Sequence, residues 1–344
     1  MSQVSKDLDQ ILSETESSLG KVTSQSVLLT GGTGFVGTWL TQSWASAARR
    51  FGASGRLVIL SRDPENFVRQ HGPFPDQVSF IRGDIRSLDL VGHGSFDLVI
   101  HAATPARATI NSDSPSEMLS IILDGQRNLI EQVTRSGRPR VLFTSSGAIY
   151  GPQPVDVDRV AETQLTGPDP LNPLAAYHEG KRMAELLLSI AAKQGDIEAV
   201  IARLFAFVGP YLPLDEHFAV GNFIRDGLAG GPIVVKGDGL TVRSYQYPTD
   251  MVRWLWTLAD IARPQRAYNV GSDQGYSMRE IATAVGDACG VSEVQILGVP
   301  DATRPIDRYV PDVTRIRDEL KLVNKIDFTE ALRRTVAWHR SIPR

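Results

Sequence analysis

One pair of residues in this chain has the types and the spacing of a proton-transfer site. Tyr177 and Lys181 stand four residues apart in the segment Tyr-His-Glu-Gly-Lys, so a helix would place them one above the other on one face. A phenol titrates near about 10 in isolation, and a neighbouring ammonium stabilises its phenolate and brings proton transfer closer to neutral pH. The same spacing is also found where a half-buried tyrosine lies beside a solvated lysine, so the pair needs support from elsewhere in the chain.

A glycine-rich turn near the N-terminus is suited to hold a second reactant. Gly31, Gly34 and Gly37 follow the apolar run 27–30, and an apolar, helix-compatible segment begins at once. Such glycines permit a sharp turn, let backbone N–H groups approach a pyrophosphate, and let helix and strand pack closely. The N–H groups and the positive dipole end of the helix then form an anion site. Strand, turn and helix in this order predict a dinucleotide-binding loop.

Alternating strands and helices must bring these two groups of residues to one place. Apolar runs typical of buried strands recur at 27–30, 56–60, 78–81, 96–100, 140–144 and 199–203. Helix-like stretches between them include 115–133 and 175–193. This alternation predicts an α/β fold built on a doubly wound parallel sheet of the Rossmann type. Ligands of such sheets bind at the carboxyl ends of strands. The strand-end residues expected to converge on one crevice are 31–37, Ser61, Arg62, Asp84, Ala103, Thr104 and 144–146.

Local composition and segment length divide the chain into three parts. Residues 1–24 form an N-terminal extension with apolar residues at roughly helical spacing, which predicts a short helix. Residues 25–209 are the predicted dinucleotide-binding domain. Beyond residue 209 proline and glycine become frequent and segments shorten, so 210–344 is predicted to be mainly a smaller substrate domain, with 268–271 returning a strand to the main sheet. Whether the extension packs on its own domain or on a second subunit is left open.

The composition excludes several classes of function. The 344 residues carry a formal net charge of −3, with 42% apolar and 22% charged residues, which is typical of a globular protein and offers no basic surface for nucleic acid. No apolar run is long enough to span a bilayer, and the N-terminus lacks the blocks of a secretory signal. Cys289 is the single cysteine, and His101 and His178 have no partners at metal-binding spacing. We therefore expect a cytoplasmic protein without a metal, a membrane partner or a nucleic-acid partner.

Several motifs in a characteristic order reveal a family resemblance. From about Ser26 to the C-terminus, the chain resembles the extended short-chain dehydrogenase/reductase family, also called the NAD-dependent epimerase/dehydratase family, in its nucleotide-sugar-modifying branch. The motifs that carry this resemblance are 30–37, 101–103, 144–151, 177–181, 203–205, 209–210, 222–224, 237–239 and 243–247. Their joint order and spacing are more specific than any one of them.

The resemblance implies roles for the residues that match its motifs. Tyr177 would be the catalytic base or acid at the sugar C4 oxygen, Lys181 would lower its pKa and bind the nicotinamide ribose, and Ser146 would donate to the same oxygen. Tyr150 is expected to be structural or to line the pocket. The implied cofactor-binding residues are Gly31, Thr33, Gly34, Phe35, Val36, Gly37, Ser61, Arg62, Asp84, Ile85, Ala102, Ala103, Thr104, Thr144 and Lys181.

The residues after the second strand bear on the choice between NAD and NADP. An acidic residue there would accept hydrogen bonds from the adenosine ribose, whereas this chain has Ser61 and Arg62, which suit a 2′-phosphate. These residues favour NADP over NAD. In the alternative, Arg62 stacks on adenine while Asp63 binds the ribose. Asp84 resembles the family's adenine-contacting aspartate, and a loop-capping role would equally explain it.

The resemblance also predicts the second ligand and the assembly. Asn222, Arg243 and Arg308 match positions that in the family contact the diphosphate of a nucleoside-diphosphate sugar. Two guanidinium groups from separate loops would hold a diphosphate without a globally basic surface. The family's usual homodimer would pair the helices near 115–133 and 175–193.

Two positions narrow the reaction. The family's 4,6-dehydratases carry an Asp-Glu pair where this chain has Gly147 and Ala148, and its UDP-glucuronate decarboxylases carry a glutamate at the position of Ala148. The segments 177–182 and 222–224 nevertheless look most like those decarboxylases. The favoured function is hydride transfer at sugar C4, as an epimerase or a 4-ketoreductase. The alternatives are decarboxylase-like or dehydratase activity and, from another class, a non-catalytic protein that senses nicotinamide nucleotides.

Overall fold

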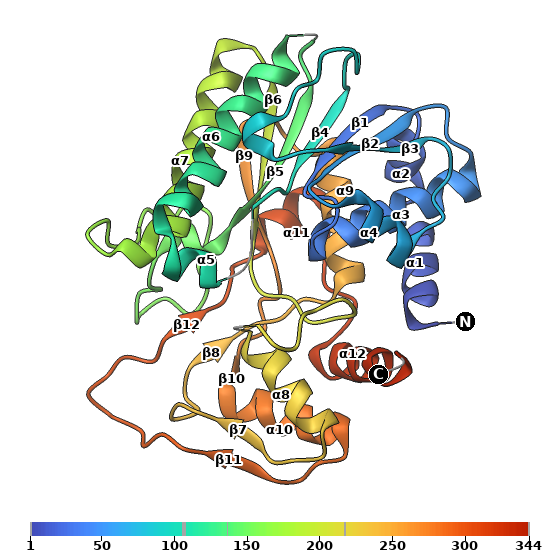
Figure 1. Ribbon diagram of the computed structural model, residues 1–344. Helices are drawn as coiled ribbons and strands as arrows, with labels where there is room; N and C mark the ends of the chain where they lie inside the picture. Colours follow the sequence, from blue (N-terminus) through green and yellow to red (C-terminus); the bar gives the residue numbers. More distant parts are fainter. Residues whose placement is uncertain (1, 105–107, 136, 217, 343–344) are drawn as a thin grey trace.

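A large parallel sheet forms the centre of the molecule (Figure 1). The computed structural model describes residues 2–104, 108–135, 137–216 and 218–342. The sheet has seven strands in the order β3-β2-β1-β4-β5-β6-β9, and every neighbouring pair is parallel. The strands are β1 (Ser26–Thr30), β2 (Arg56–Ser61), β3 (Val78–Arg82), β4 (Leu98–His101), β5 (Arg140–Ser146), β6 (Glu198–Leu204) and β9 (Arg266–Val270). The predicted doubly wound α/β fold is confirmed.

Helices cover both faces of this sheet because alternate strand residues point to opposite sides. On one face, Leu29 and Ile59 pack in a core with α3 (Phe35–Phe51), α9 (Pro248–Ile261) and α11 (Thr314–Leu320). On the other, Leu28 and Val58 pack in a second core with α6 (Pro115–Thr134) and α7 (Ala176–Gln194). Shorter connecting elements are α4 (Pro64–His71), α5 (Ala108–Asp113) and the 3₁₀ turns η1 (Ile85–Ser87), η2 (Gly147–Tyr150) and η3 (Pro173–Ala175).

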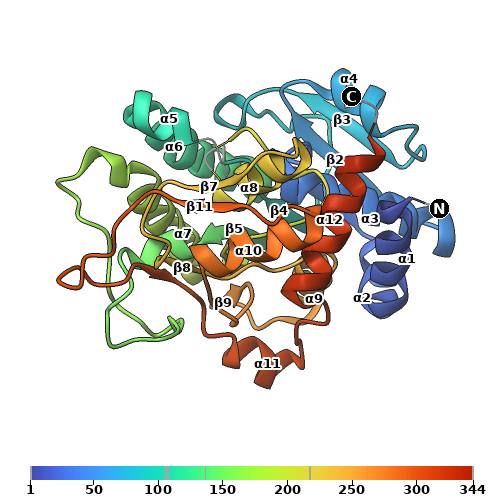
Figure 2. The same cartoon turned by 90° about the horizontal axis from the view of Figure 1, so that it is seen from below.

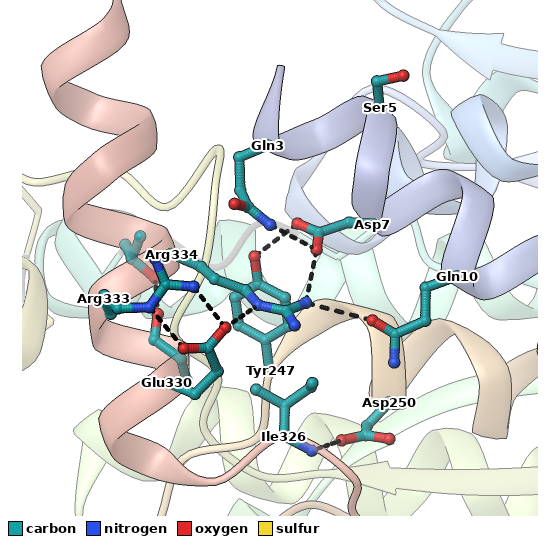
Figure 3. A network of polar contacts seen from close by, with 12 residues as sticks. Gln3, Ser5, Asp7, Gln10, Tyr247, Asp250, Ile326, Glu330, Arg333 and Arg334 are labelled. Atoms are coloured by element: carbon teal, nitrogen blue, oxygen red, sulfur yellow. Dashed lines mark hydrogen bonds and ion pairs between the residues drawn. The ribbon is translucent and has the colours of Figure 1, made fainter. Parts of the chain in front are cut away.

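The N-terminal extension packs on its own chain. It forms α1 (Gln3–Glu14) and α2 (Glu16–Val22), whose apolar residues are buried in the core shared with α3 and α9. Asp7 of α1 is fully buried, where it accepts hydrogen bonds from the Tyr247 hydroxyl at 2.6 Å, Gln3 at 2.9 Å and Arg334 at 2.8 Å (Figure 3). Arg334 belongs to α12 (Phe328–Ser341). The first helix is therefore joined by a buried ion pair to the last one.

The C-terminal third builds a second, smaller unit of structure. It contains a three-stranded sheet, β10-β8-β12, and a parallel pair, β11-β7. Their bounds are β7 (Ile233–Val235), β8 (Val242–Arg243), β10 (Tyr276–Ser277), β11 (Val294–Ile296) and β12 (Arg308–Tyr309). The helices α8 (Ala219–Leu228) and α10 (Met278–Cys289) pack against these strands in a third core. Seen from below, α8, α10, β7 and β11 lie in front of β4 and β5 (Figure 2), so this unit stands beneath the carboxyl edge of the large sheet.

Candidate active site at the carboxyl edge of the sheet

The end of β5 and the first turns of α7 bring Ser146, Tyr177 and Lys181 together. The Lys181 ammonium donates a hydrogen bond of 2.7 Å to the carbonyl oxygen of Thr144, and the Ser146 hydroxyl is hydrogen-bonded to Tyr177. Ser146 also accepts from the Ala148 N–H at 3.1 Å, so its side chain begins the η2 turn. The three predicted catalytic residues therefore share one place in the structure.

Burial determines the acid–base properties of the pair. Lys181 is 2% exposed, and its ammonium lies 4.6 Å from the centre of the Phe143 ring and 5.9 Å from that of Tyr177. Burial lowers the pKa of Lys181 to about 7, although the Glu185 carboxylate opposes this shift. Burial raises the pKa of Tyr177 above its ordinary value, and the hydrogen bond to Ser146 opposes that. The lysine therefore titrates near neutral pH while the phenol holds its proton.

A residue that the sequence did not point to fixes the start of the catalytic helix. Asn111 of α5 accepts a hydrogen bond from the Tyr177 N–H at 3.0 Å and donates one of 2.7 Å to the carbonyl oxygen of Leu174. The residue before α7, Ala175, has no side chain able to cap the helix. Asn111 therefore supplies a cap from another helix. Only the folded chain reveals this contact, because the two residues are far apart in sequence.

His101 lies beneath the site as a neutral residue. Its Nδ1 is 2.7 Å from the Thr30 hydroxyl, and its ring stacks on Phe143 with centres 5.4 Å apart. Burial, and secondarily the charge of Lys181, lower the pKa of His101 to about 3. Within the described residues no group of three or more histidine, cysteine or acidic side chains could hold a metal ion.

The glycine loop is shaped for close approach of backbones. Gly31 has φ +71°, and a Cβ there would lie 2.3 Å from the Ala102 carbonyl oxygen; a Cβ on Gly37 would lie 2.1 Å from the carbonyl oxygen of Gly31. Helix α3 begins after Gly34, which has no side chain to cap it. The first-turn N–H groups are thus left for an anion. These features fit the pyrophosphate of a dinucleotide, whose nearby contacts would come from Thr33, Phe35, Val36, Ala103 and Thr104.

The side chains at the adenosine end are partly committed to protein contacts. The Ser61 hydroxyl lies 3.2 Å from the Thr33 hydroxyl and accepts from the Asp63 N–H, while the Asp63 carboxylate caps α4. Asp84 begins the η1 turn, next to Ile85, and binds Arg86 through both carboxylate oxygens, which lowers the pKa of Asp84. Arg62 is exposed, and its guanidinium makes no hydrogen bond or ion pair with the part of the chain that the structure describes.

The two predicted diphosphate arginines are not brought together. In the sheet β10-β8-β12, Arg243 pairs with Tyr309 and Arg308 pairs with Val242. Neighbouring strand residues point to opposite faces, so the two guanidinium groups lie on opposite sides of this sheet. Arg243 forms an ion pair of 2.6 Å with Asp307.

Arg308 and Asn222 also lie in surroundings of their own, apart from each other. Arg308 lines a cavity of about 610 Å³ that also contains Arg159 and three carboxylates, those of Asp158, Asp273 and Glu280. Asn222 lies on α8, where its side-chain oxygen accepts from Arg225 at 3.0 Å. The structure therefore gathers the predicted catalytic residues but not the predicted diphosphate residues.

Tyr309 was missed by sequence reasoning, which singled out only its neighbour Arg308. From β12 its hydroxyl donates a hydrogen bond of 3.5 Å to the carbonyl oxygen of Leu204 and also lies within hydrogen-bonding reach of Ser146, and its ring centre lies 4.6 Å from that of Phe205. Burial raises the pKa of Tyr309. Arg308 and Tyr309 are consecutive strand residues, so their side chains point to opposite faces of the small sheet. This alternation is the only signal in the sequence that could have placed Tyr309 on the face opposite to Arg308.

Phe205 explains the glycine at position 147. A Cβ on Gly147 would lie 2.6 Å from the Phe205 ring. The space next to Ser146 that an acidic side chain at position 147 would need is therefore filled by an aromatic ring, which itself packs at a tilt of 34° against Tyr309. This wall of the site is aromatic and not acidic.

Comparisons with known proteins agree with this geometry. A model of the NAD dependent epimerase/dehydratase family matches residues 27–271. UDP-glucuronic acid decarboxylase 1 of Arabidopsis thaliana is 28% identical over 92% of this chain and 70% of its own length, and decarboxylase 2 of the same plant is covered to 66%. The structure of MoeE5 in complex with UDP-glucose and NAD is 26% identical, covers 92% of this chain and 98% of that chain, and has a TM-score of 0.73.

The fold likeness extends to more distant structures. A UDP-glucose 4-epimerase of Thermotoga maritima, solved with UDP-glucose, superimposes with a TM-score of 0.78 at 22% identity and covers 92% of this chain and 98% of that chain. The chain belongs to the NAD dependent epimerase/dehydratase family, and the predicted resemblance is confirmed. No helix of the described residues combines the length and the apolar character needed to cross a bilayer.

Proposed function

We propose that this member of the NAD dependent epimerase/dehydratase family transfers a hydride reversibly at C4 of a nucleotide-activated sugar, as an epimerase or a 4-ketoreductase. The observation that carries the proposal is the cluster of Ser146, Tyr177 and Lys181 beside an aromatic wall that offers no carboxylate at position 147. The same cluster favours an enzyme over a protein that only senses nicotinamide nucleotides, because binding alone needs no phenol beside a buried ammonium.

The chemistry divides between cofactor and protein. A bound nicotinamide nucleotide would supply the hydride acceptor or donor, and the glycine loop residues 31–37 would hold its pyrophosphate. Tyr177 removes the proton of the C4 hydroxyl as the alcohol becomes a ketone and returns a proton in reverse. Ser146 donates to the same oxygen, and the Lys181 ammonium stabilises the phenolate. A ketone at C4 that is reduced from its opposite face yields the epimer.

Two neighbouring positions argue against elimination and decarboxylation. Dehydration needs an acid and a base next to the sugar, whereas the structure has Gly147 packed under Phe205 and Ala148 beside it. Decarboxylation of UDP-glucuronate is the second candidate, favoured by the 28% identity with the plant decarboxylase. The UDP-glucuronate decarboxylases that the chain resembles carry a glutamate where this chain has Ala148, and this difference argues against decarboxylation.

Cofactor choice rests on the end of β2. The family is NAD-dependent, and the comparisons do not support a preference for NADP. The exposed guanidinium of Arg62, whose charge also helps to lower the pKa of Asp84, is a feature that suits a 2′-phosphate. If Arg62 binds that phosphate, Arg62→Ala weakens NADPH binding about tenfold in a fluorescence titration and leaves NADH binding unchanged. Equal loss for both cofactors would indicate stacking on adenine, and no loss for either would remove Arg62 from the site.

The homodimer proposed for this protein has a suitable surface on α7. Met183, Leu186 and Ile190 follow one another at helical spacing and are about half exposed, at 45%, 52% and 47%. Pairing α6 and α7 with those of a second copy would cover this stripe. Sedimentation of the wild-type protein and of Leu186→Glu tests the proposal, since the charged variant should be monomeric.

A product panel tests the reaction. Purified protein is incubated with nucleoside-diphosphate sugars, UDP-glucuronate and 4-keto-6-deoxy sugars, each with NAD(H) or NADP(H), and the products are identified by mass spectrometry. Epimer formation without net cofactor turnover indicates the epimerase, and consumption of reduced cofactor indicates the ketoreductase. Loss of carbon dioxide from UDP-glucuronate would overturn the proposal in favour of the decarboxylase. Cofactor binding without turnover of any sugar would favour the sensing protein.

A further inference from the structure

Three consecutive residues of β5 each contact a different turn of the catalytic helix. The pairs are Thr144 with Lys181 (2.7 Å, carbonyl oxygen to Nζ), Ser145 with Glu185 (2.6 Å, Oγ to Oε1) and Ser146 with Tyr177. Their partners stand at i, i+4 and i+8 on α7, so they line one face of the helix. The proposed chemistry uses two of these contacts. The third, between Ser145 and Glu185, has no part in it.

Glu185 is a buried carboxylate, and both of its oxygens accept hydrogen bonds from other side chains. It is 8% exposed and accepts the Ser145 hydroxyl. Arg203 of β6 donates to both of its oxygens, from Nε at 3.1 Å and from Nη2 at 2.8 Å. The same arginine donates to the Tyr150 hydroxyl at 2.8 Å, and Tyr150 donates onward to Asn269 of β9 at 2.8 Å. Glu185 is therefore held from two neighbouring strands and has little freedom to move.

The charges around Lys181 make the Glu185 carboxylate important for the protonation state of that lysine. Among the titratable and charged groups on the elements packed around it are His101 on β4, Tyr177 and Glu185 on α7, Tyr150 on η2 and Arg203 on β6. His101 is neutral at physiological pH because its pKa is about 3. Glu185 favours the ammonium form of Lys181 against the effect of burial. Without that carboxylate, the charge of Arg203 would remain and would disfavour the ammonium further.

We propose that Glu185 is a positioning residue of the active site, which, anchored by Ser145 and Arg203, sets the register of α7 against β5 and keeps Lys181 charged beside Tyr177. This inference rests on the proposed function only in assigning the chemistry to Tyr177 and Lys181. The contacts themselves do not depend on the substrate. A buried carboxylate one helical turn beyond the lysine thus belongs to the acid–base unit although it touches no reactant.

The test measures the titration of Lys181 directly in the 344-residue protein. Lysine side chains labelled with ¹³C and ¹⁵N are followed by NMR against pH, with the Lys181 signal assigned from Lys181→Arg. In Glu185→Gln, which keeps the volume and the acceptor for Ser145, we expect the Lys181 midpoint to fall by about one pH unit from its wild-type value. Glu179→Gln removes the same charge from the same helix at a half-exposed position, paired with Arg182 at 3.5 Å, and should leave the midpoint unchanged.

Kinetics on any sugar that the wild type converts gives the second readout. Near pH 7, kcat of Glu185→Gln should fall about fivefold to tenfold because fewer molecules carry the ammonium, and it should recover as the pH is lowered. Glu185→Asp, which keeps the charge, should restore most of the midpoint. Ser145→Ala keeps the charge and loses the anchor, so it should lower kcat at every pH and leave KM for the sugar unchanged.

Each outcome decides the inference. A folded Glu185→Gln protein with an unchanged Lys181 midpoint would overturn it, as would a loss of kcat that is the same at every pH. If Glu185→Gln does not fold, Glu185→Asp and Ser145→Ala still test the register, and normal kcat in both would overturn it. If the wild type converts no sugar, the proposed function fails while the NMR titration still confirms or overturns the role of Glu185.

Discussion

The junction of β5 with α7 and the junction of β8 with β12 organise their side chains in different ways. In the first, helical spacing along α7 and consecutive residues of one strand bring Ser146, Tyr177 and Lys181 close together. In the second, pairing between strands far apart in sequence decides which residues face the site, and Tyr309 faces it while Arg308 faces a separate cavity. Spacing within one helix can be read from a sequence; register between distant strands depends on the whole fold.

The largest expected effect tests the first junction. Tyr177→Phe removes the phenol oxygen but keeps the ring, so we expect kcat to fall about 10²- to 10⁴-fold with nicotinamide binding retained. Steady-state kinetics and a cofactor titration measure the two quantities. Full activity in this variant would show that the contact between Ser146 and Tyr177 is a structural one.

The second junction is tested by its two arginines. If only the face of the small sheet that carries Arg243 and Tyr309 meets the sugar nucleotide, Arg243→Ala should raise KM about tenfold or more through loss of a charged hydrogen bond, and Arg308→Ala should leave it within about twofold. Equal losses in both variants would mean that the sheet rearranges so that both guanidinium groups bind the diphosphate, as the sequence suggested. The matched control is Arg317→Ala, an exposed arginine of α11.

These two regions also show which features of the fold and the site can be predicted from the sequence. The parallel sheet, the glycine loop and the Tyr177–Lys181 face followed from local pattern, because strand alternation and helix spacing are local properties. The predicted convergence of Arg243 with Arg308 is not seen in the structure, because two-residue strands carry no periodic signal and their pairing is set by tertiary contacts. The roles of Asn111 and Phe205 could likewise not be predicted from the sequence, since each contacts a site residue that is far away along the chain.

A substitution at Gly147 tests the contact that joins the two regions. Because a Cβ there would collide with the Phe205 ring, Gly147→Ala should lower the free energy of unfolding by about 1–3 kcal/mol, as overpacking does. Urea unfolding followed by circular dichroism measures the change. Phe205→Leu in the same protein should recover part of the loss by opening space. An unchanged midpoint in Gly147→Ala would show that the ring moves aside readily and that the aromatic wall admits a larger side chain.

The smallest expected effect concerns the hydroxyl of Tyr309, which extends from the junction of β8 with β12 to Ser146 at the end of β5. Tyr309→Phe keeps the ring beside Phe205 and removes the hydroxyl that interacts with Ser146 and donates to the Leu204 carbonyl, so kcat should change only about twofold to tenfold, in line with about 0.5–1.5 kcal/mol for one neutral hydrogen bond. The direction of the change is informative. A slower enzyme would mean that Tyr309 holds the Ser146 hydroxyl in the orientation that serves the reacting oxygen. A faster one would mean that it competes with Tyr177 for that hydroxyl, and the second region would then restrain the first.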